Sequence, residues 1–220
     1  MCGRYVISLS LDQLGDLFEV PDRPNFAANY NAAPTQSLPV IRRGREGEMR
    51  LSLIRWGLVP HWSKTGPDKA KPLINARSET AATKPTFRTA MKRRRALIPA
   101  DGFYEWHRRE DGTKQPYYIT RADEEPFVFG GLWERWGEGE ERIDSFAILT
   151  NEAGPDISDI HHRCPIIIER EDHARWLDPD TDPEGFFPVQ GVGKVHKRAV
   201  SSRVNRVREN DPGLLDAFEE

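Results

Sequence analysis

The sequence is poor in cysteine and in long apolar runs. Its 220 residues include two cysteines, Cys2 and Cys164, which are too few for the disulfide framework of a small secreted protein. No apolar run approaches the roughly 20 residues of a membrane-spanning helix, and the first residues lack the basic and apolar regions of a secretory signal. We therefore expect a protein without a membrane span, in the cytoplasm, or in the nucleus if the source is a eukaryote.

Motifs for nucleotides, dinucleotides and metals are also missing. The sequence has no G-x-G-x-x-G, Walker A, H-E-x-x-H or paired C-x-x-C pattern. His161, His162 and Cys164 stand close together, but structural zinc sites use separated, regularly spaced ligand pairs. We predict neither a metal site nor a cofactor.

The net charge of −3 hides an uneven distribution. Residues 64–99 carry ten Lys or Arg and two acidic residues, a net charge of +8. Residues 194–208 carry six Lys or Arg and no acidic residue, so the remaining residues carry −17. Such segregation can place a basic groove on an acidic body, as polyanion binding requires. Solvated helix faces give the same pattern, so charge alone leaves nucleic-acid binding open.

Short elements separated by turns fill the chain, without repeats or a linker rich in Pro, Gly or Ser, so we expect one domain over residues 1–220. Apolar patterning predicts strands at residues 4–8, 38–42, 50–56, 96–99, 103–107, 117–120, 127–133, 145–150 and 165–168. It predicts helices at residues 11–18, with Ser10 as N-cap, and at 79–83, 85–93, 170–177 and 212–218. Residues 29–39 are predicted to form a loop. This pattern favours the α+β class, with a barrel-like, mainly antiparallel β core and a few peripheral short helices.

Cys2 has chemistry that Cys164, a candidate buried apolar side chain, does not share. Met1 is normally removed when the second residue is small, and Cys2 then carries an α-amine, of ordinary pKa about 8, beside a thiol of about 8.5. Such a 1,2-aminothiol condenses with an aldehyde to an imine and then closes a five-membered thiazolidine ring. A frayed, inert terminus is the alternative interpretation.

Two other segments combine polar groups in a pattern that packing does not require. In residues 73–79, a period of two places Asn75, Arg77 and Glu79 on one strand face. An edge strand with a solvated face explains the same pattern. Glu105 lies between Tyr104 and Trp106, where desolvation raises a carboxyl pKa toward the range useful for general acid–base catalysis. A structural glutamate fits this position equally well.

His161 and His162 form a third segment, directly before an apolar strand. An imidazole can move protons near neutral pH, although a loop histidine without a chemical role is the alternative.

Six segments, taken in order, resemble the signature of the SOS-response-associated peptidase (SRAP) family. They are residues 1–5 (MCGRY), 29–34 (NYNAAP), 56–62 (WGLVPHW), 74–80 (INARSET), 100–106 (ADGFYEW) and 159–165 (DIHHRCP). The resemblance spans residues 2 to about 205. It implies a sensor of abasic sites in single-stranded DNA that crosslinks itself to the lesion and shields it. We expect a monomer, associated with the nucleoid in a prokaryote or nuclear in a eukaryote.

The resemblance also implies a catalytic set. Cys2 is then the nucleophile, through its amine and its thiol, and the product is a thiazolidine crosslink. Glu105 is a general acid and base, and His161 opens the sugar ring or moves a proton at its hydroxyl. Asn75 positions Cys2 and the deoxyribose.

A second set of residues is implied to contact DNA. Arg4 and Arg77 would bind phosphates and Trp62 and Trp106 would stack on bases, while the pocket would be shaped by Asn31, Pro34 and Thr150. The sequence departs from the family pattern at His162, where an acidic residue is frequent, and at Cys164, where a larger residue is frequent. Two other functions are compatible with these residues: an autocatalytic cysteine-type peptidase that removes residues before Cys2, and a non-covalent binder of modified or single-stranded DNA.

Overall fold

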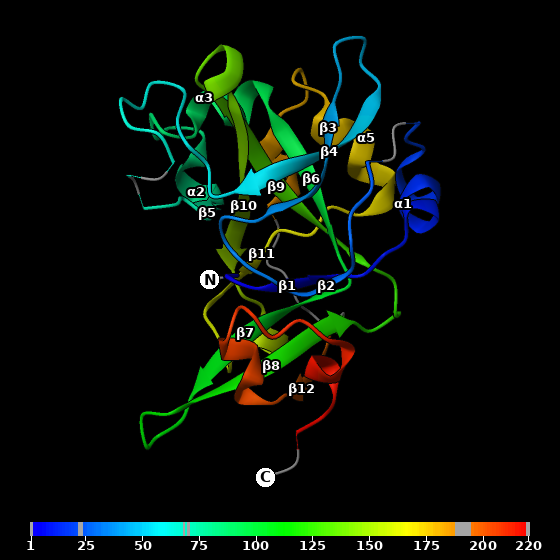
Figure 1. Ribbon diagram of the computed structural model, residues 1–220, viewed down its shortest axis with the longest axis vertical. Coiled ribbons are helices and arrows are strands. Elements are labelled where there is room, and N and C mark those ends of the chain that lie inside the picture. Colours follow the sequence, from blue (N-terminus) through cyan, green and yellow to red (C-terminus); the bar gives the residue numbers. More distant parts are fainter. Residues whose placement is uncertain (1, 22–23, 68, 70, 188–194, 219–220) are drawn as a thin grey trace.

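A closed five-stranded barrel and a smaller sheet form the centre of the computed structural model, which describes residues 2–21, 24–67, 69, 71–187 and 195–218 (Figure 1). Around the barrel, β10 (Ile143–Glu152), β4 (Met49–Trp56), β3 (Ser37–Arg43), β6 (Arg95–Ala100) and β9 (Phe127–Trp136) follow one another, and β9 pairs again with β10. These pairs are antiparallel except for β4 with β10. The predicted α+β class with a barrel-like core is therefore confirmed.

Strand β10 is longer than the barrel, and its last residues carry two further strands. Residues 148–150 pair in parallel with β5 (Asn75–Arg77), and residues 150–152 pair antiparallel with β11 (Arg163–Pro165). The described end of β10 therefore brings segments that are almost 90 positions apart to its two sides.

The smaller sheet, which we call the lower sheet after its place in Figure 1, lies against the barrel. Its strand order is β12 (Val195–Ala199), β8 (Lys114–Arg121), β7 (Gly102–Arg108), β1 (Tyr5–Ile7) and β2 (Asn29–Ala32). Side chains alternate between its two faces. Tyr5 and Phe103 point to the barrel core, whereas Val6 and Tyr104 pack with Val204 of the C-terminal segment on the other face.

Short helices surround these sheets. Helix α1 (Leu11–Phe18) has the predicted bounds, because Ser10 and Gln13 cap each other's backbone groups at its start. The other α-helices are α2 (Ser78–Ala81), α3 (Arg88–Arg93), α4 (Pro155–Ser158) and α5 (His173–Leu177). The 3₁₀ helices are η1 (Gly139–Glu141), η2 (Arg170–Asp172), η3 (Pro183–Phe186), η4 (Ser202–Asn205) and η5 (Pro212–Leu215). Among the described helices, none is long and apolar enough to cross a membrane.

Several predicted elements were wrong. The loop expected at residues 29–39 contains β2 and the start of β3, because the polar residues of β2 pair with β1 rather than follow an apolar pattern. The strand expected at residues 165–168 is β11, which begins two residues earlier and ends three residues earlier. The helix expected at residues 170–177 splits into η2 and α5, and that at 212–218 is the short η5. Strand β12 was missed because it is polar and mostly exposed.

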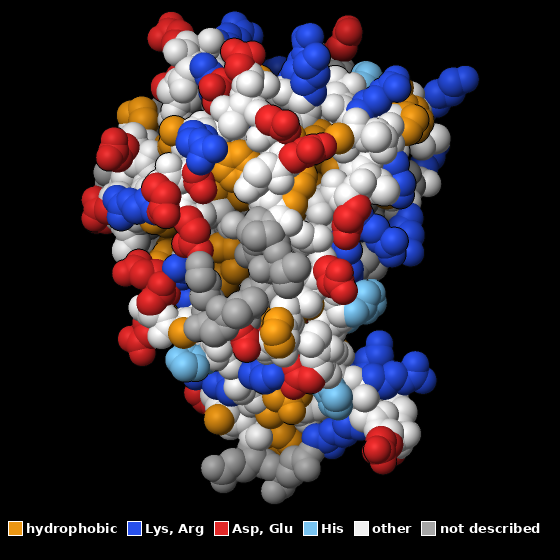
Figure 2. Space-filling view, turned by 180° about the vertical axis from the view of Figure 1, so that it is seen from behind, with side chains coloured by type: hydrophobic (Ala, Val, Ile, Leu, Met, Phe, Trp, Pro, Cys, Tyr) orange, Lys and Arg blue, Asp and Glu red, His pale blue; other side chains and the backbone are white. Residues whose placement is uncertain are grey.

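Charged side chains are unevenly spread over the surface, as the sequence indicates. In Figure 2, Lys and Arg gather along the right-hand edge, and many Asp and Glu lie along the left-hand edge. Because this view is turned by 180° from Figure 1, the basic edge lies on the side of α2 and α3. The described basic residues of that region are mostly exposed, among them Arg77, Lys84 and Arg88.

Candidate active site

Cys2 lies in the protein interior, beside the amide of Asn75. Its side chain has 0% exposure, and its thiol makes a long contact of 3.8 Å with the Arg4 carbonyl oxygen. The Nδ2 atom of Asn75 donates to the Cys2 carbonyl oxygen at 2.9 Å. The Oδ1 atom of the same amide is buried and accepts no hydrogen bond from the described residues. Asn75 thus holds the backbone of Cys2, and its Oδ1 atom is a buried acceptor without a partner among the described residues.

Glu105 reaches the same place from β7. The antiparallel register pairs Tyr5 with Phe103, and its continuation by two residues places Glu105 beside Gly3. Glu105 is 2% exposed, and burial raises its pKa above the ordinary value for a glutamate. Burial and the Glu105 carboxylate both raise the pKa of the Cys2 thiol. The predicted acid and nucleophile are therefore neighbours, and the Glu105 carboxylate favours the protonated form of the Cys2 thiol.

The two histidines stack on each other at the end of the loop between α4 and β11. Their ring centroids are 4.5 Å apart at an interplanar angle of 23°. The Nδ1 atom of His161 lies 3.0 Å from the Arg163 backbone nitrogen, which donates to it, so its ring orientation is fixed. Burial lowers the pKa of His161 to about 4, so this ring is neutral near neutral pH. His162 is exposed, and its charge acts to lower the pKa of Glu105.

Arg163 connects the two strands that flank the end of β10, a role that the sequence reasoning missed. Its side chain is buried, and it forms an ion pair with Glu79 in which NH2 donates to Oε2 at 2.9 Å. It also donates to the Thr150 carbonyl oxygen at 2.5 Å, and Thr150 Oγ1 lies 3.4 Å away. The predicted strand face of Asn75, Arg77 and Glu79 was wrong at Glu79. Because the chain enters α2 at Ser78, Glu79 does not lie on the face that Asn75 and Arg77 share. The signal in the sequence that could have indicated this role is the presence of an arginine in the motif at residues 159–165.

Arg4 and Asn31 both bind the C-terminal segment. Arg4 NH1 donates to Asn31 Oδ1 and to the Val204 carbonyl oxygen, each at 2.7 Å. Asn31 has 0% exposure, and its Nδ2 atom lies 3.2, 3.0 and 2.9 Å from the carbonyl oxygens of Val204, Arg206 and Glu209. Strand alternation explains this, since Arg4 points away from the barrel. Their implied DNA contacts stay predictions.

The remaining implied DNA contacts differ in exposure. Arg77 is exposed at the end of β5, on the face of Asn75. Trp62 is 57% exposed and lines a cavity of about 220 Å³. Trp106 is half-buried and donates from Nε1 to Asn205 Oδ1 at 2.8 Å, so it faces the C-terminal segment. Pro34 is half-buried in the turn after β2. The structure thus places Arg77 near Asn75, and Trp106 on the face of the lower sheet opposite to Glu105.

Comparison with known proteins identifies the family. The family described as SOS response associated peptidase (SRAP) matches residues 1–207. The chain belongs to the SRAP family. Its relatives include abasic site processing protein YoqW of Bacillus subtilis (strain 168), 34% identical over 226 residues and covering 99% of this chain and 100% of the relative. Abasic site processing protein YedK of Escherichia coli (strain K12) is 34% identical over 201 residues, covering 89% and 87%. Protein HMCES of Pongo abelii is 30% identical over 268 residues, covering 98% and 75%.

Solved structures agree with this SRAP assignment in fold. A protein of Bacteroides thetaiotaomicron superposes with a TM-score of 0.86 at 22% identity, covering 99% of this chain and 100% of that one. A protein of Bordetella bronchiseptica gives 0.78 at 30% identity, covering 91% and 100%.

His162 and Cys164, the two residues expected to depart from the SRAP pattern, lie in and directly before β11. His162 stacks on His161, as described above. Cys164 is buried, and burial raises its pKa to about 12. Its thiol contacts the Glu152 carbonyl oxygen at 3.8 Å, and its charge also acts on the pKa of Cys2. Cys164 is thus the buried side chain that the sequence indicates.

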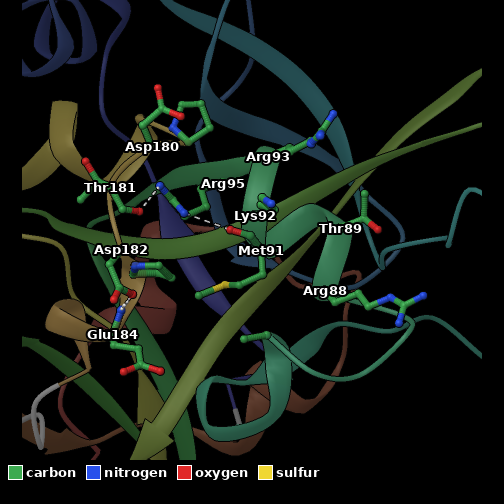
Figure 3. Close-up of a pocket in the computed structure, with 13 residues that line it drawn as sticks. Arg88, Thr89, Met91, Lys92, Arg93, Arg95, Asp180, Thr181, Asp182 and Glu184 are labelled. Carbon is green, nitrogen blue, oxygen red and sulfur yellow. Dashed lines mark hydrogen bonds between the residues drawn. The ribbon is translucent and has the colours of Figure 1, made fainter.

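A separate cavity of about 690 Å³ lies between α3 and residues 179–184 (Figure 3). Arg95 crosses its floor and donates to the carbonyl oxygens of Met91 and Thr181, each at 3.0 Å. Basic residues of α3 and acidic residues such as Asp180 and Glu184 both line this cavity, and in Figure 3 the side chains of Arg88 and Arg93 point away from the acidic residues. None of its described lining residues is a predicted SRAP site residue. Arg95 here joins α5 and its following loop to β6, so part of the basic run at residues 92–95 is structural.

Proposed function

We propose that this chain recognises abasic sites in single-stranded DNA and forms a covalent thiazolidine crosslink through Cys2 after Met1 is removed. The observation that carries the proposal is the convergence on Cys2: Asn75 holds its carbonyl oxygen at 2.9 Å, and Glu105 is close enough for its charge to raise the pKa of the Cys2 thiol. The names of the relatives, abasic site processing proteins, support the same substrate.

The first step is attack of the Cys2 amine on the ring-opened sugar. Neutral His161 takes the proton of the C1 hydroxyl. The bond between C1 and the ring oxygen then breaks as the aldehyde C=O forms, and the ring oxygen takes a proton and becomes the C4 hydroxyl. The amine adds to the aldehyde carbon, and loss of water gives an imine. Glu105 keeps its proton to a higher pH than an exposed glutamate because burial raises its pKa, so it can protonate the departing hydroxyl.

The second step closes the ring. The Cys2 sulfur adds to the imine carbon, the electron pair of the C=N bond moves to nitrogen, and the thiol proton leaves sulfur while nitrogen gains a proton. Because Cys2 has 0% exposure, substrate reaches the sulfur only after the first residues of the chain rearrange.

Binding of the DNA strand falls to exposed cations on the basic edge. Arg77 lies two residues after Asn75 on the same strand face. Lys84 follows on the connection between α2 and α3, and Arg88 and Lys92 lie on α3. Phosphates beside the lesion would then lie along this edge, with Trp62 as an exposed stacking surface. We take residues 1–220 as one domain acting as a monomer, on the nucleoid of a prokaryote or in the nucleus of a eukaryote.

The test is incubation with a single-stranded oligonucleotide that carries one abasic site, followed by a denaturing gel. We expect a stable shifted band with the wild-type chain and with Cys164→Ala, the matched removal of the other buried thiol, and no band with Cys2→Ala. Absence of the wild-type band would refute the proposal and leave non-covalent binding. Intact mass gives a second reading: retained Met1 is incompatible with thiazolidine chemistry, whereas removal only when Glu105 and Cys2 are present would favour the self-peptidase alternative.

A further inference from the structure

The small cavity lined by Trp62 takes no part in the proposed mechanism. Its volume of about 220 Å³ is below the roughly 300–1,000 Å³ of pockets that hold drug-sized ligands, so it suits a single planar ring system. Its walls are largely apolar and include Leu58, Pro72 and Leu73. Trp62 is the one aromatic residue among its described lining residues, and 57% of its surface is exposed. The cavity therefore combines apolar walls with an accessible aromatic side chain.

The backbone around the cavity is held in place without any ligand. The backbone nitrogen of Leu58 donates to the Leu73 carbonyl oxygen at 3.0 Å, and the two residues form an antiparallel bridge. Gly57 has a φ of 122°, and a Cβ atom at this position would lie 2.6 Å from the Cβ atom of Pro72. Only glycine allows the two segments to approach so closely. The cavity is therefore preformed, which lowers the entropic cost of filling it.

The cavity lies next to the candidate active site along the chain. Leu73, in its wall, precedes Asn75 by two residues, and two residues of an extended chain span about 7 Å. The carbonyl oxygen of Ile74, between them, accepts a hydrogen bond from Trp56 Nε1 at 3.0 Å, which fixes this spacing. Nucleotides follow one another at about 3.4 Å along a stacked strand. A strand with its abasic site at Asn75 therefore has a neighbouring nucleotide within reach of the cavity.

The charges at the cavity suit a nucleic-acid strand. Arg55 and Lys71 are the charged residues among its described lining residues, and both are cations. Lys71 is exposed, whereas Arg55 is half-buried and donates from NH1 to the Thr35 carbonyl oxygen at 3.0 Å. Surfaces that bind single strands combine cations for the phosphates with aromatic rings on which bases stack. An uncharged planar base that is joined to phosphates matches this combination.

We propose that the cavity binds the base of a nucleotide close to the abasic site, with that base stacked on Trp62. The inference rests on the proposed function and adds a second subsite for the same substrate. Lys71 then lies close to the phosphates of that nucleotide. Because every base has a face that can stack, the subsite requires that a base is present at one position but tolerates any of the four bases.

The test removes bases one at a time. Single-stranded oligonucleotides carry a tetrahydrofuran abasic analogue, which has no aldehyde and cannot crosslink, and a second analogue at successive positions on either side. Binding of the wild-type chain is measured by fluorescence anisotropy. We expect the second analogue to weaken binding about tenfold at one position near the first, the effect of one lost stacking contact, and to have little effect elsewhere.

Trp62→Ala should bind the oligonucleotide with a single analogue about tenfold more weakly, and the second analogue should then have the same small effect at every position. Trp62→Phe, which keeps an aromatic ring, should keep the dependence on position. Leu53→Ala is the matched control, because Leu53 is an exposed apolar residue, 39% exposed, that does not line the cavity. It should behave like the wild-type chain.

A wild-type chain that binds all the doubly substituted oligonucleotides equally would overturn the inference. So would a Trp62→Ala variant that keeps the wild-type dependence on position. The proposed function is tested separately, by the crosslink to a natural abasic site. A requirement for one base without any crosslink would support the base subsite and refute the covalent chemistry, whereas a crosslink without that requirement would refute the subsite alone.

Discussion

Asn31 offers the most direct test of how the C-terminal segment is held. Its amide has two hydrogens for three nearby carbonyl oxygens, so Asn31→Ala removes two donated hydrogen bonds, and it also removes the acceptor of Arg4 NH1 at 2.7 Å. At about 1 kcal/mol for each of these three bonds, the free energy of unfolding should fall by about 3 kcal/mol. For a chain of this size, the melting temperature should fall by roughly 6–12 °C.

Urea unfolding followed by circular dichroism measures this loss, and hydrogen exchange locates it. We expect the amides of residues 202–209 to lose protection first, because the backbone carbonyls of that segment lose their partner. Asn31→Asp keeps the acceptor for Arg4 but turns an anion toward three carbonyl oxygens, so it should be at least as unstable. A loss below about 1 kcal/mol for Asn31→Ala, or an Asn31→Asp variant as stable as wild type, would refute this account.

Three further predictions concern chemistry and binding. Glu105→Gln should slow crosslinking at least about tenfold. In the wild-type chain the acid form of Glu105 should be lost only above the ordinary glutamate range, because burial raises its pKa, and a pH–rate profile with its falling limb at the unshifted value would contradict this. His161→Ala should reduce crosslinking far more than His162→Ala, and equal losses for the two variants would show that His161 is wrongly assigned. His162→Asp should move the pH profile of crosslinking upward, because an anion at this position raises the pKa of both Glu105 and His161. Non-covalent binding to single-stranded DNA can be measured on Cys2→Ala by fluorescence anisotropy. The logarithm of the binding constant should fall with the logarithm of the salt concentration at a slope of about −0.7 per neutralised phosphate, and Arg77→Ala should reduce the size of that slope by about 0.7. An unchanged slope would show that Arg77 does not contact phosphate.

Local signals in the sequence explain which elements could be predicted. Helix α1 was predicted to its ends because its leucines and Phe18 recur at helical spacing directly after Ser10, and the structure shows that Ser10 forms a capping box with Gln13. Strands β2 and β12 carry mostly polar side chains and are stabilised by pairing with β1 and β8. The apolar pattern of the sequence therefore does not predict them. The barrel strands were found because each is rich in apolar residues, although their closure into a ring depends on the pairing of β9 with β10.

The candidate site divides in the same way. Asn75 and Arg77 could be placed on one face from their spacing, whereas the proximity of Cys2, Glu105 and His161 followed only from a family resemblance. The partners of Arg163 could not be read from the sequence, because they depend on two strands that meet at β10. The alternation of side chains along β1 and β7 determines which of them lie near Cys2. This alternation could be assigned to the two faces only once the pairing of the two strands was known.

The overhang of β10 has a consequence for how this protein can change over time. Residues 143–148 of β10 pair with β9 and close the barrel. Residues 148–152, which form the overhang, pair with β5 and β11. A substitution inside the ring alters stability but leaves the spacing of Asn75 and His161 unchanged. An insertion of one residue in the overhang would turn every later side chain to the opposite face and separate the groups that meet at Cys2. Substitutions in the barrel core should therefore be tolerated during evolution, whereas insertions or deletions at residues 148–152 should not.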